Sequence, residues 1–276
     1  MAVGVSGFLN NLKEVLLSRH KDRTTISVGQ YQINILKDMA WAFNDGRYYE
    51  INVEHWLKHL LGKIEKPVFY DVGSNYGYYS VILSHLTKAT YAFEPVAETF
   101  NVLKKNIKKN RIKNIIPFQF ALSDKEENIS INIYSSSGNN SLFNRSIPTD
   151  HPTKHIGKAN IRTKTLDSLI LKATNPIHKP DLIKIDVEGA ELNVLRGSRY
   201  IVEKYRPVLL VEYSETTSID AGYTSKDIFN FIKEMDYVIY GLPEDATDLN
   251  LIPIDNDIQV PISNILAIPK HAKLIS

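Results

Sequence analysis

Residues 67–77 read Pro-Val-Phe-Tyr-Asp-Val-Gly-Ser-Asn-Tyr-Gly, an apolar run that ends in an acid and a turn with two glycines. The run from Pro67 to Asp71 predicts a short buried strand, and residues 78–86 predict the helix that follows it. Gly73 and Gly77 let the backbone of the turn come close to a ligand. Because open α/β sheets bind ligands at the carboxyl ends of their strands, we expect a binding site at this turn.

The same strand-then-helix pattern continues along the chain. A second strand is predicted from Thr90 to Glu94, followed by a helix whose apolar face carries Val96, Phe100, Leu103 and Ile107. Further strands are predicted at 115–122, 182–187 and 208–213, helices at 191–204 and 225–235, and a closing pair of strands at 237–240 and 262–268. Near-continuous apolar strands joined by helices predict an α/β fold with a doubly wound, mostly parallel sheet covered on both faces.

Two segments depart from this pattern. At the front, residues 5–20 predict an amphipathic helix, 26–36 a small hairpin and 51–62 another helix, so we divide the chain into an N-terminal extension (1–62) and a main domain (63–276). The first helix is a candidate for dimerisation or for a membrane surface, although packing on its own domain is the favoured interpretation. Residues 123–165 are an insertion with a strand at 129–134 and an aperiodic stretch at 146–158, suited to a lid that shapes a substrate site.

Composition limits the class of protein. The chain has 276 residues, 43% hydrophobic and 23% charged, with a net charge of +2, which indicates a globular protein without a strong field for nucleic acid or acidic membrane. The absence of cysteine excludes disulfides, zinc–cysteine sites and thiol catalysis. No apolar run approaches the roughly 18 residues of a membrane span, and the first 25 residues do not resemble a secretory signal. We therefore expect a soluble cytoplasmic protein.

The turn after the first strand indicates the kind of ligand. Asp71 is placed to accept a hydrogen bond from a ligand ammonium, and Glu94, at the end of the second strand, to accept both hydroxyls of a ribose. A dinucleotide site would need Gly-x-Gly-x-x-Gly to seat a pyrophosphate. Here Asn75 replaces the central glycine, and two tyrosines follow Gly77. A nucleoside ligand without phosphates, such as S-adenosylmethionine, suits this turn better.

Residues 121–124, Ala-Leu-Ser-Asp, end the third predicted strand, where an adenine would lie. Ser123 or Asp124 is a candidate to bind the adenine amine. An ordinary turn or helix-cap role for Asp124 is an equally good explanation.

Residues 182–191, Leu-Ile-Lys-Ile-Asp-Val-Glu-Gly-Ala-Glu, form the second informative segment. A lysine in a buried parallel strand is costly unless it is paired or functional. If the strand continues, Lys184, Asp186 and Glu188 share one side of it, at the same sheet edge as Gly73. We favour a site role for Lys184 and Asp186, whereas Glu191 fits the first turn of a helix equally well.

These segments together resemble a known family. Asp71–Gly77, Phe93-Glu94-Pro95, Ala121–Asp124, Thr165-Leu-Asp167-Ser-Leu and Lys184–Glu191 closely resemble the FkbM-type methyltransferases, in the same order and at similar spacing. The resemblance implies the seven-stranded class I methyltransferase fold and methyl transfer from S-adenosylmethionine to a hydroxyl of a sugar, a glycan or a polyketide-type product. It implies that Gly73, Asn75 and Gly77 cradle the cofactor, that Glu94 holds the ribose and that Asp186 lies nearest the methyl. We add Ser74, Pro95, Ala121 and Ser123 to the predicted cofactor-binding residues; alanine is common at the position of Ser74, and a small residue is retained.

The reaction that this family catalyses needs an oriented hydroxyl and a group that takes its proton. Asp186 is the first candidate for that base, with Lys184 fixing its charge or orienting the acceptor. His151 and His155, in the insertion, are second candidates. A metal held by Asp186 with Glu188 or Glu212 lacks a specific spacing signature, so no metal is predicted. We expect a sugar, nucleotide-sugar or glycan as acceptor, with a polyketide, lipid or phosphate-type acceptor as the alternative. Residues 1–50 and 135–160 match no motif, so the identity of the acceptor does not follow from the resemblance.

Other classes of protein explain parts of the same sequence. A nicotinamide dehydrogenase would share the fold, but the turn lacks the Gly-x-Gly-x-x-Gly pattern that a dinucleotide needs. A nucleic-acid methyltransferase is suggested by the basic cluster Lys104, Lys105, Lys108, Lys109, Arg111 and Lys113, yet a solvated helix face explains it better, so we expect no nucleic-acid partner. Enzymes that methylate amines often carry an Asn/Asp-Pro-Pro-aromatic turn where Asp186-Val-Glu-Gly stands here. A non-catalytic scaffold would not need the turn and Glu94 together.

Overall fold

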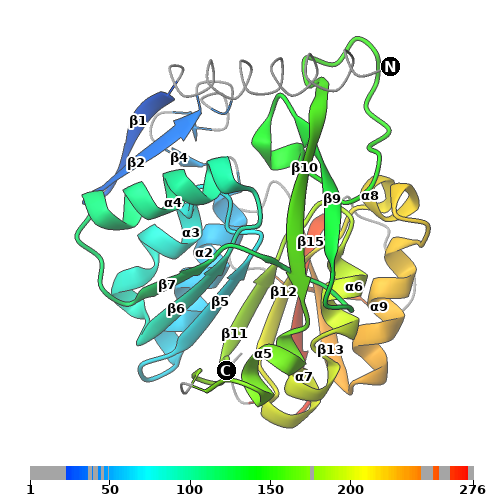
Figure 1. Ribbon diagram of the computed structural model, residues 1–276. Helices are drawn as coiled ribbons and strands as arrows, with labels where there is room; N and C mark the ends of the chain where they lie inside the picture. The colour runs from blue at the N-terminus through cyan, green and yellow to red at the C-terminus, as the bar shows by residue number, and fades with distance from the viewer. Residues whose placement is uncertain are drawn as a thin grey trace.

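An eight-stranded sheet forms the centre of the protein, with helices on both faces (Figure 1). The computed structural model describes residues 23–36, 39, 43–44, 47–48, 50–174, 177–243, 251–254 and 262–272. The strand order across the sheet is β14-β13-β15-β12-β11-β5-β6-β7. The strands are β5 (Val68–Val72), β6 (Ala89–Phe93), β7 (Ile115–Phe118), β11 (Leu182–Ile185), β12 (Val208–Glu212), β13 (Tyr237–Pro243), β14 (Ile252–Pro253) and β15 (Ile262–Pro269).

The sheet is mostly parallel, as predicted. β12, β11, β5, β6 and β7 pair in parallel, whereas β15 and β13 pair antiparallel and close one edge. These seven strands confirm the predicted seven-stranded fold, and the two-residue β14 adds only a short edge pairing with β13. Five parallel strands therefore end at one edge, which brings the ends of β5, β6, β11 and β12 together.

Alternate strand residues pack into two separate cores, one on each face of the sheet. Phe69, Leu182 and Leu210 belong to the core that contains α2 (Ile51–Lys63), α3 (Tyr78–Ile82) and α4 (Ala97–Lys109). The residues next to them, Tyr70, Ile183 and Leu209, belong to the second core. That second core contains side chains of α5 (Leu166–Leu171), α6 (Glu191–Arg196), α7 (Arg199–Tyr205) and α9 (Ser225–Glu234). Both faces of the sheet are buried, which explains why its strands are apolar without alternation.

Three predicted elements are each divided in two. The helix predicted at 78–86 is α3 followed by a short 3₁₀ turn, η2 (Ser84–Leu86), and the helix predicted at 191–204 is α6 followed by α7. Gly197, which follows α6, packs closely against the inserted region, since a Cβ there would lie 2.0 Å from the carbonyl oxygen of Ser123. The strand predicted at 115–122 is β7 and then β8 (Ala121–Leu122), and β8 pairs with an inserted strand instead of the main sheet.

The N-terminal part packs directly on the main domain. The predicted hairpin is present as β1 (Arg23–Val28) and β2 (Tyr31–Leu36), and the predicted helix at 51–62 is α2. Buried Asn106 of α4 fastens the hairpin, since its Oδ1 accepts from the Asn34 backbone N–H (2.8 Å) and its Nδ2 donates to the Tyr76 carbonyl (2.9 Å). Two short strands, β3 (Phe43–Asn44) and β4 (Arg47–Tyr48), follow. The helix predicted at 5–20 lies outside the described residues.

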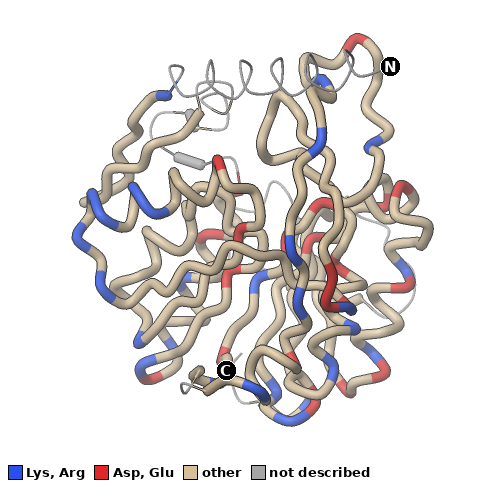
Figure 2. Tube along the Cα trace, in the orientation of Figure 1, with Lys and Arg blue, Asp and Glu red and all other residues tan. Residues whose placement is uncertain are grey.

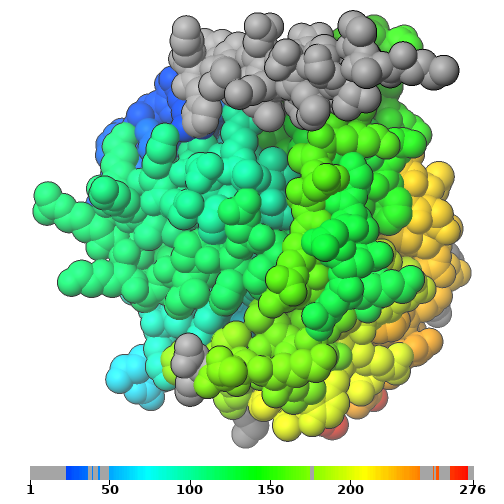
Figure 3. Space-filling model, viewed as in Figure 1, coloured from blue at the N-terminus to red at the C-terminus, as the bar shows by residue number. Residues whose placement is uncertain are grey.

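The insertion forms a second, small sheet. β9 (Asn128–Tyr134) confirms the predicted strand, and it pairs antiparallel with β10 (His155–Lys164). The prediction of an aperiodic stretch up to residue 158 was wrong for its last part, because β10 begins at His155. This strand is largely polar and has exposed positions along its length, so it lacks an apolar strand signal. In Figure 3, the green to yellow-green surface of these strands crosses between α4 and the orange α9 region.

The basic cluster of the sequence lies on the outer side of α4. The four lysines of the cluster in α4 are exposed, and so are Arg111 and Lys113 after the helix. Phe100 and Leu103, on the other side of the helix, are buried. Figure 2 shows these blue positions along the outside of the helix. The cluster therefore lies opposite the apolar face of the helix, as predicted. Within the described ranges, no helix combines the length and apolarity needed to cross a membrane.

We expect Gly73→Ala to destabilise the fold. Gly73 has φ +85°, and a Cβ there would lie 1.8 Å from the backbone oxygen of Asp186, so β5 and β11 would have to separate. We predict a loss of about 3 kcal/mol or more in the free energy of unfolding, measured by urea denaturation. Gly62→Ala is the control, because Gly62 lies in α2 and a Cβ added there would have no atom within 4 Å; it should raise stability by about 0.5–1 kcal/mol. Equal effects of the two substitutions would contradict this account.

Candidate functional site

A pocket lies at the carboxyl edge of the parallel strands, where the sequence predicted a binding site. Its wall combines the turn after β5, the ends of β6, β11 and β12, the inserted sheet and part of the N-terminal segment. The charged residues of this wall among the described residues are Glu50, Asp71, Glu94, Lys184, Asp186, Glu188 and Glu212. Six carboxyl groups against one lysine favour a ligand that carries positive charge.

The glycine turn forms one wall of the pocket. The backbone N–H groups of Gly73 and Ser74 donate to the Phe93 carbonyl (3.1 and 3.0 Å), which fixes the turn against β6. Asn75 has φ +49°, a conformation that asparagine tolerates better than most residues. The Ser74 hydroxyl is buried, lines the pocket and has no hydrogen-bond partner among the described residues. A buried polar atom without a partner is uncommon, and here it faces the space that the cofactor would fill.

Gly77 begins α3 at the end of the turn. Its φ is +79°, and a Cβ there would lie 2.3 Å from Leu103 Cδ1 of α4. The glycine thus serves the close packing of α3 on α4. Gly77 is absent from the pocket wall, so its contribution to a cofactor site would come through the shape of the turn.

Asp71 is buried at the end of β5 and lines the pocket. Its Oδ2 accepts hydrogen bonds from the Ser80 backbone N–H (3.1 Å) and hydroxyl (2.6 Å). Burial raises the pKa of Asp71, and the Lys184 charge and the Ser80 hydrogen bonds oppose that rise. The structure therefore uses one oxygen of Asp71 to hold the start of α3.

Glu94 lies between the turn and the start of α4. Its Oε2 accepts from the Asn75 N–H (3.0 Å), and its Oε1 accepts from the Val96 N–H (2.9 Å) and the Thr99 hydroxyl (2.6 Å). Burial raises the pKa of Glu94 to about 7, although these hydrogen bonds favour the ionised form. Each carboxylate oxygen has two lone pairs, so this rigidly held group can still accept from a ribose.

Only some of the residues predicted to lie near the adenine line the pocket. Pro95, Ala121 and Leu122 line it. Ser123 is buried but absent from the wall, and its hydroxyl donates to Asp124 (3.2 Å) while its N–H donates to Lys164 of β10 (2.9 Å). These contacts give Ser123 a structural role at the junction of the two sheets.

Buried Lys184 forms an ion pair with the partly exposed Asp186 at the end of β11. Lys184 Nζ donates to Asp186 Oδ2 at 2.6 Å and lies 4.9 Å from the centre of the Tyr79 ring. Burial alone would lower the pKa of Lys184, but the charges of Asp186, Glu50 and Asp71 outweigh it and raise this pKa. Lys184 therefore stays protonated and links three carboxylates across the pocket.

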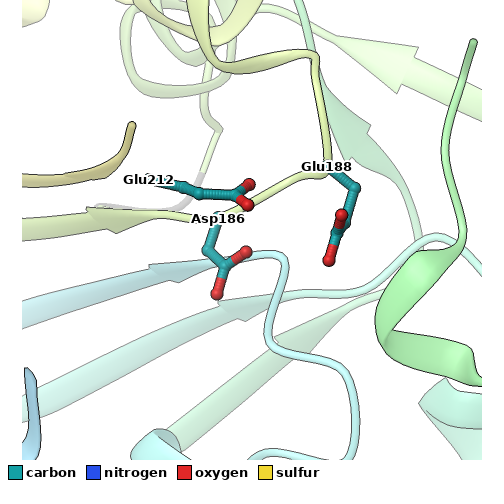
Figure 4. A group of neighbouring side chains, drawn as sticks. All are labelled: Asp186, Glu188 and Glu212. Carbon is teal, nitrogen blue, oxygen red and sulfur yellow. The ribbon is translucent and has the colours of Figure 1, made fainter. Parts of the chain in front are cut away.

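Asp186, Glu188 and Glu212 lie close together at the loop after β11 (Figure 4). Their carboxylate oxygens lie within 4.8 Å of one another. The Arg145 guanidinium forms an ion pair with Glu188 and lies 3.8 Å from Asp220. Burial raises the pKa of Glu188 to about 8, and the Arg145 charge opposes that rise. Oxygen ligands of this kind suit Mg²⁺ or Ca²⁺, but Lys184 and Arg145 already neutralise two of the three, so we assign no metal to them.

Glu191 is part of the backbone framework, which supports the structural interpretation of this residue. Its Oε1 accepts from the Val187 N–H (2.9 Å) and its Oε2 from the Gly189 N–H (3.1 Å). Tyr223 also donates to Glu191 Oε2 (3.3 Å). Glu191 thus holds the loop between β11 and α6, where Glu188 has φ +56°. The strand ends at Ile185, so this loop, rather than strand alternation, brings Glu188 beside Asp186.

The structure does not bring the two candidate histidines to the pocket. His151 is exposed and its Nδ1 accepts from the Thr153 N–H (3.1 Å). His155 is exposed at the start of β10, with its ring edge-on to Tyr134 at 5.3 Å. It lines a separate shallow depression that includes Arg145 and Lys154.

The N-terminal segment also lines this pocket, which we did not predict from the sequence. Ile35, Met39, Phe43 and Glu50 all line it. Glu50 accepts from the Tyr79 hydroxyl (3.0 Å); burial raises its pKa and the Lys184 charge opposes that rise. No local signal marks these residues, because the hairpin and the start of α2 reach the pocket only through tertiary packing.

The insertion also contributes to the wall. Ser137 donates to Asn75 Oδ1 (3.2 Å) and bonds the Tyr76 hydroxyl, so η3 (Ser137–Asn139) rests on the glycine turn. Leu142 and Asn140 line the pocket as well. The insertion therefore lies against the glycine turn and forms part of the pocket wall.

The pocket fits S-adenosylmethionine in three respects. Its acidic wall suits the sulfonium and ammonium charges, Glu94 offers a carboxylate that can accept from hydroxyls, and the Ser74 hydroxyl has no hydrogen-bond partner among the described residues. None of these groups is arranged for a pyrophosphate.

Comparison with known proteins agrees with the geometry. The family model of the methyltransferase FkbM domain matches residues 71–239. The hexuronic acid methyltransferase AglP of Haloferax volcanii is 32% identical over 171 residues, which cover 62% of this chain and 63% of that protein. The match thus spans less than two thirds of that relative. Methyltransferase sdnD of Sordaria araneosa is 26% identical over 210 residues, 64% of this chain and 80% of that protein.

Solved structures give more distant matches. The methyltransferase FkbM of Methylobacillus flagellatus is 16% identical with a TM-score of 0.45, covering 73% of this chain and 43% of that one. A ribosomal protein L11 methylase of Lactobacillus delbrueckii is 13% identical with a TM-score of 0.45, covering 90% and 99%. These likenesses are too weak to add to the topology described above. The family model covers more than half of the chain, from the glycine turn to β13, and the chain therefore belongs to the FkbM family of S-adenosylmethionine-dependent methyltransferases.

Proposed function

We propose that the protein methylates a hydroxyl group of a sugar, a nucleotide-sugar or a glycan. The observation that carries this proposal is the Lys184–Asp186 ion pair at the end of β11, in the same pocket as the cofactor turn. A hydroxyl must lose its proton on methylation, and carboxylates can bind it and take that proton. The hexuronic acid named for the Haloferax relative supports a sugar acceptor.

We propose that the glycine turn, Ser74 and Glu94 bind the cofactor. The Ser74 hydroxyl would contact its amino-acid end, and Glu94 would accept from its ribose hydroxyls. When bound, S-adenosylmethionine supplies a methyl group on a positively charged sulfur. The acidic wall would stabilise that charge, and Pro95, Ala121 and Leu122 would contact the adenine side.

We propose that Asp186 holds the acceptor hydroxyl behind the methyl carbon. Lys184 keeps Asp186 in place through its 2.6 Å hydrogen bond, and Tyr79 and Glu50 hold Lys184 in turn. Orientation of the two reactants supplies much of the rate of such a displacement. The inserted segment around Leu142 would exclude water and shape the acceptor side of the pocket.

We expect one added methyl group, detected by mass spectrometry, when the protein is incubated with S-adenosylmethionine and a panel of nucleotide-activated sugars. The panel should include uronic acids as well as neutral sugars, because the sequence does not identify which sugar is methylated. Lipid-linked and phenolic hydroxyl compounds are the comparison set. Methylation of a lipid-linked or phenolic compound, without methylation of any sugar, would overturn the proposed acceptor class.

We expect Asp186→Asn to lower kcat by about 100-fold or more, with affinity for S-adenosylhomocysteine within about threefold of wild type. Asparagine keeps the shape but loses the charge that holds an acceptor hydroxyl. Asp167→Asn is the matched control, because Asp167 lies outside the pocket and accepts from the Tyr200 and Ile201 N–H groups. Normal turnover of the Asp186→Asn variant would remove Asp186 from the reaction.

We expect affinity for S-adenosylhomocysteine to increase with pH through about 7 and then to level off. Burial raises the pKa of Glu94 to about 7. Ribose hydroxyls donate more strongly to its ionised form, so protonation below that pH weakens binding. In Glu94→Gln the same titration should be flatter and the affinity about tenfold lower at pH 8. A wild-type pH dependence in that variant would mean that Glu94 does not hold the ribose.

A further inference from the structure

Glu212 is a carboxyl group of the pocket that the proposed reaction has not yet used. It ends β12, the strand next to β11, and its side chain lines the pocket. Glu212 Oε2 is buried and has no hydrogen-bond partner among the described residues. Figure 4 shows the Glu212 carboxyl beside Asp186, within the 4.8 Å cluster. Two neighbouring strand ends thus present two carboxyl groups to one point.

The two carboxyl groups differ in their partners. Asp186 is held by the buried Lys184 ammonium, and Glu188 by Arg145. Among the described residues, Glu212 has no ion pair with a cation. Its acidic neighbours are Asp186 and Glu188, which lie in the loop after β11, and Glu191, which begins α6. Glu191 is held in turn by Tyr223 and by loop N–H groups. Burial, and then the charges of these three acids, raise the pKa of Glu212 well above its usual value.

We propose that Glu212 receives the proton of the acceptor hydroxyl during methyl transfer. Before the reaction, the single O–H of the acceptor is shared between the neighbouring carboxylates of Asp186 and Glu212, so Asp186 orients the hydroxyl and Glu212 takes its proton. This inference rests on the proposed hydroxyl methylation. In the step, the acceptor oxygen forms a bond to the methyl carbon and the carbon–sulfur bond breaks, with its electron pair remaining on sulfur. The O–H proton passes to the Glu212 carboxylate, which becomes a neutral carboxyl group.

The charge of the pocket supports this assignment. A positive sulfonium near Glu212 favours its ionised form, so cofactor binding displaces its proton and prepares a base. Methyl transfer removes the sulfonium charge, and Glu212 then regains a proton without any change in the total charge of the pocket. Among its acidic neighbours is Glu191, whose carboxyl can accept from the neutral Glu212.

The test compares proton release on binding of S-adenosylmethionine and of S-adenosylhomocysteine, without any acceptor. Calorimetric titrations at pH 7.5 in two buffers of different ionisation enthalpy, both with a chelator, measure the protons released. We expect S-adenosylmethionine to release more, by up to about one proton per site. In Glu212→Gln the difference should disappear, whereas Asp167→Asn, whose carboxyl also has a pKa raised by burial, should keep it.

Turnover provides the second measurement. Glu212→Gln should lower kcat by about 100-fold or more, whereas Glu212→Asp should keep the proton difference and lose part of kcat because its carboxyl reaches less far. Equal proton release by the two ligands in wild type, or an unchanged difference in Glu212→Gln, would overturn the assignment of Glu212 and leave the proposed function standing. If Glu212→Gln does not fold, the loss of the proton difference in Glu212→Asp would overturn it. Failure of both ligands to bind the wild-type protein would overturn the proposed function as well.

Discussion

The close approach of β5 and β11 is the constraint on which the site depends. Gly73 follows β5 with its Cα against the backbone oxygen of Asp186, at a distance that leaves no room for a side chain. This contact places the cofactor turn beside the end of β11. Because both strands are parallel and buried, their side chains Asp71, Lys184 and Asp186 are then held at one edge. A methyl donor and a hydroxyl acceptor bound at this edge would meet there.

Buried Lys184 offsets the repulsion between the acids at this edge of the sheet. Several acids converge on one pocket, and isolated buried charges are costly. Lys184 neutralises part of this charge through Asp186, Glu50 and Asp71, and Arg145 does the same for Glu188. The remaining negative charge is well placed for a cationic cofactor. The same residues therefore stabilise the empty fold less than they would stabilise the fold with its cofactor bound.

Local patterns predicted most of the elements, and they predicted that the glycine turn and Glu94 lie at one sheet edge. Gly73, Asn75 and Glu94 lie in one turn and the strand after it, so their spacing is visible along the chain. Contacts that depend on distant segments were not visible: Glu50 reaches Lys184 from the start of α2, and Ser137 binds Asn75 from the insertion. β10 was missed because it is mostly polar. The histidines were chosen by residue type alone, and the structure places them on the surface.

The most direct test of the whole account is a crystal structure of the protein with S-adenosylhomocysteine. The account predicts ribose hydroxyls on Glu94, the amino-acid end beside Ser74, and the sulfur atom facing the space between Asp186 and Glu212. A ligand bound with its ribose away from Glu94, or with its sulfur turned away from both Asp186 and Glu212, would contradict it.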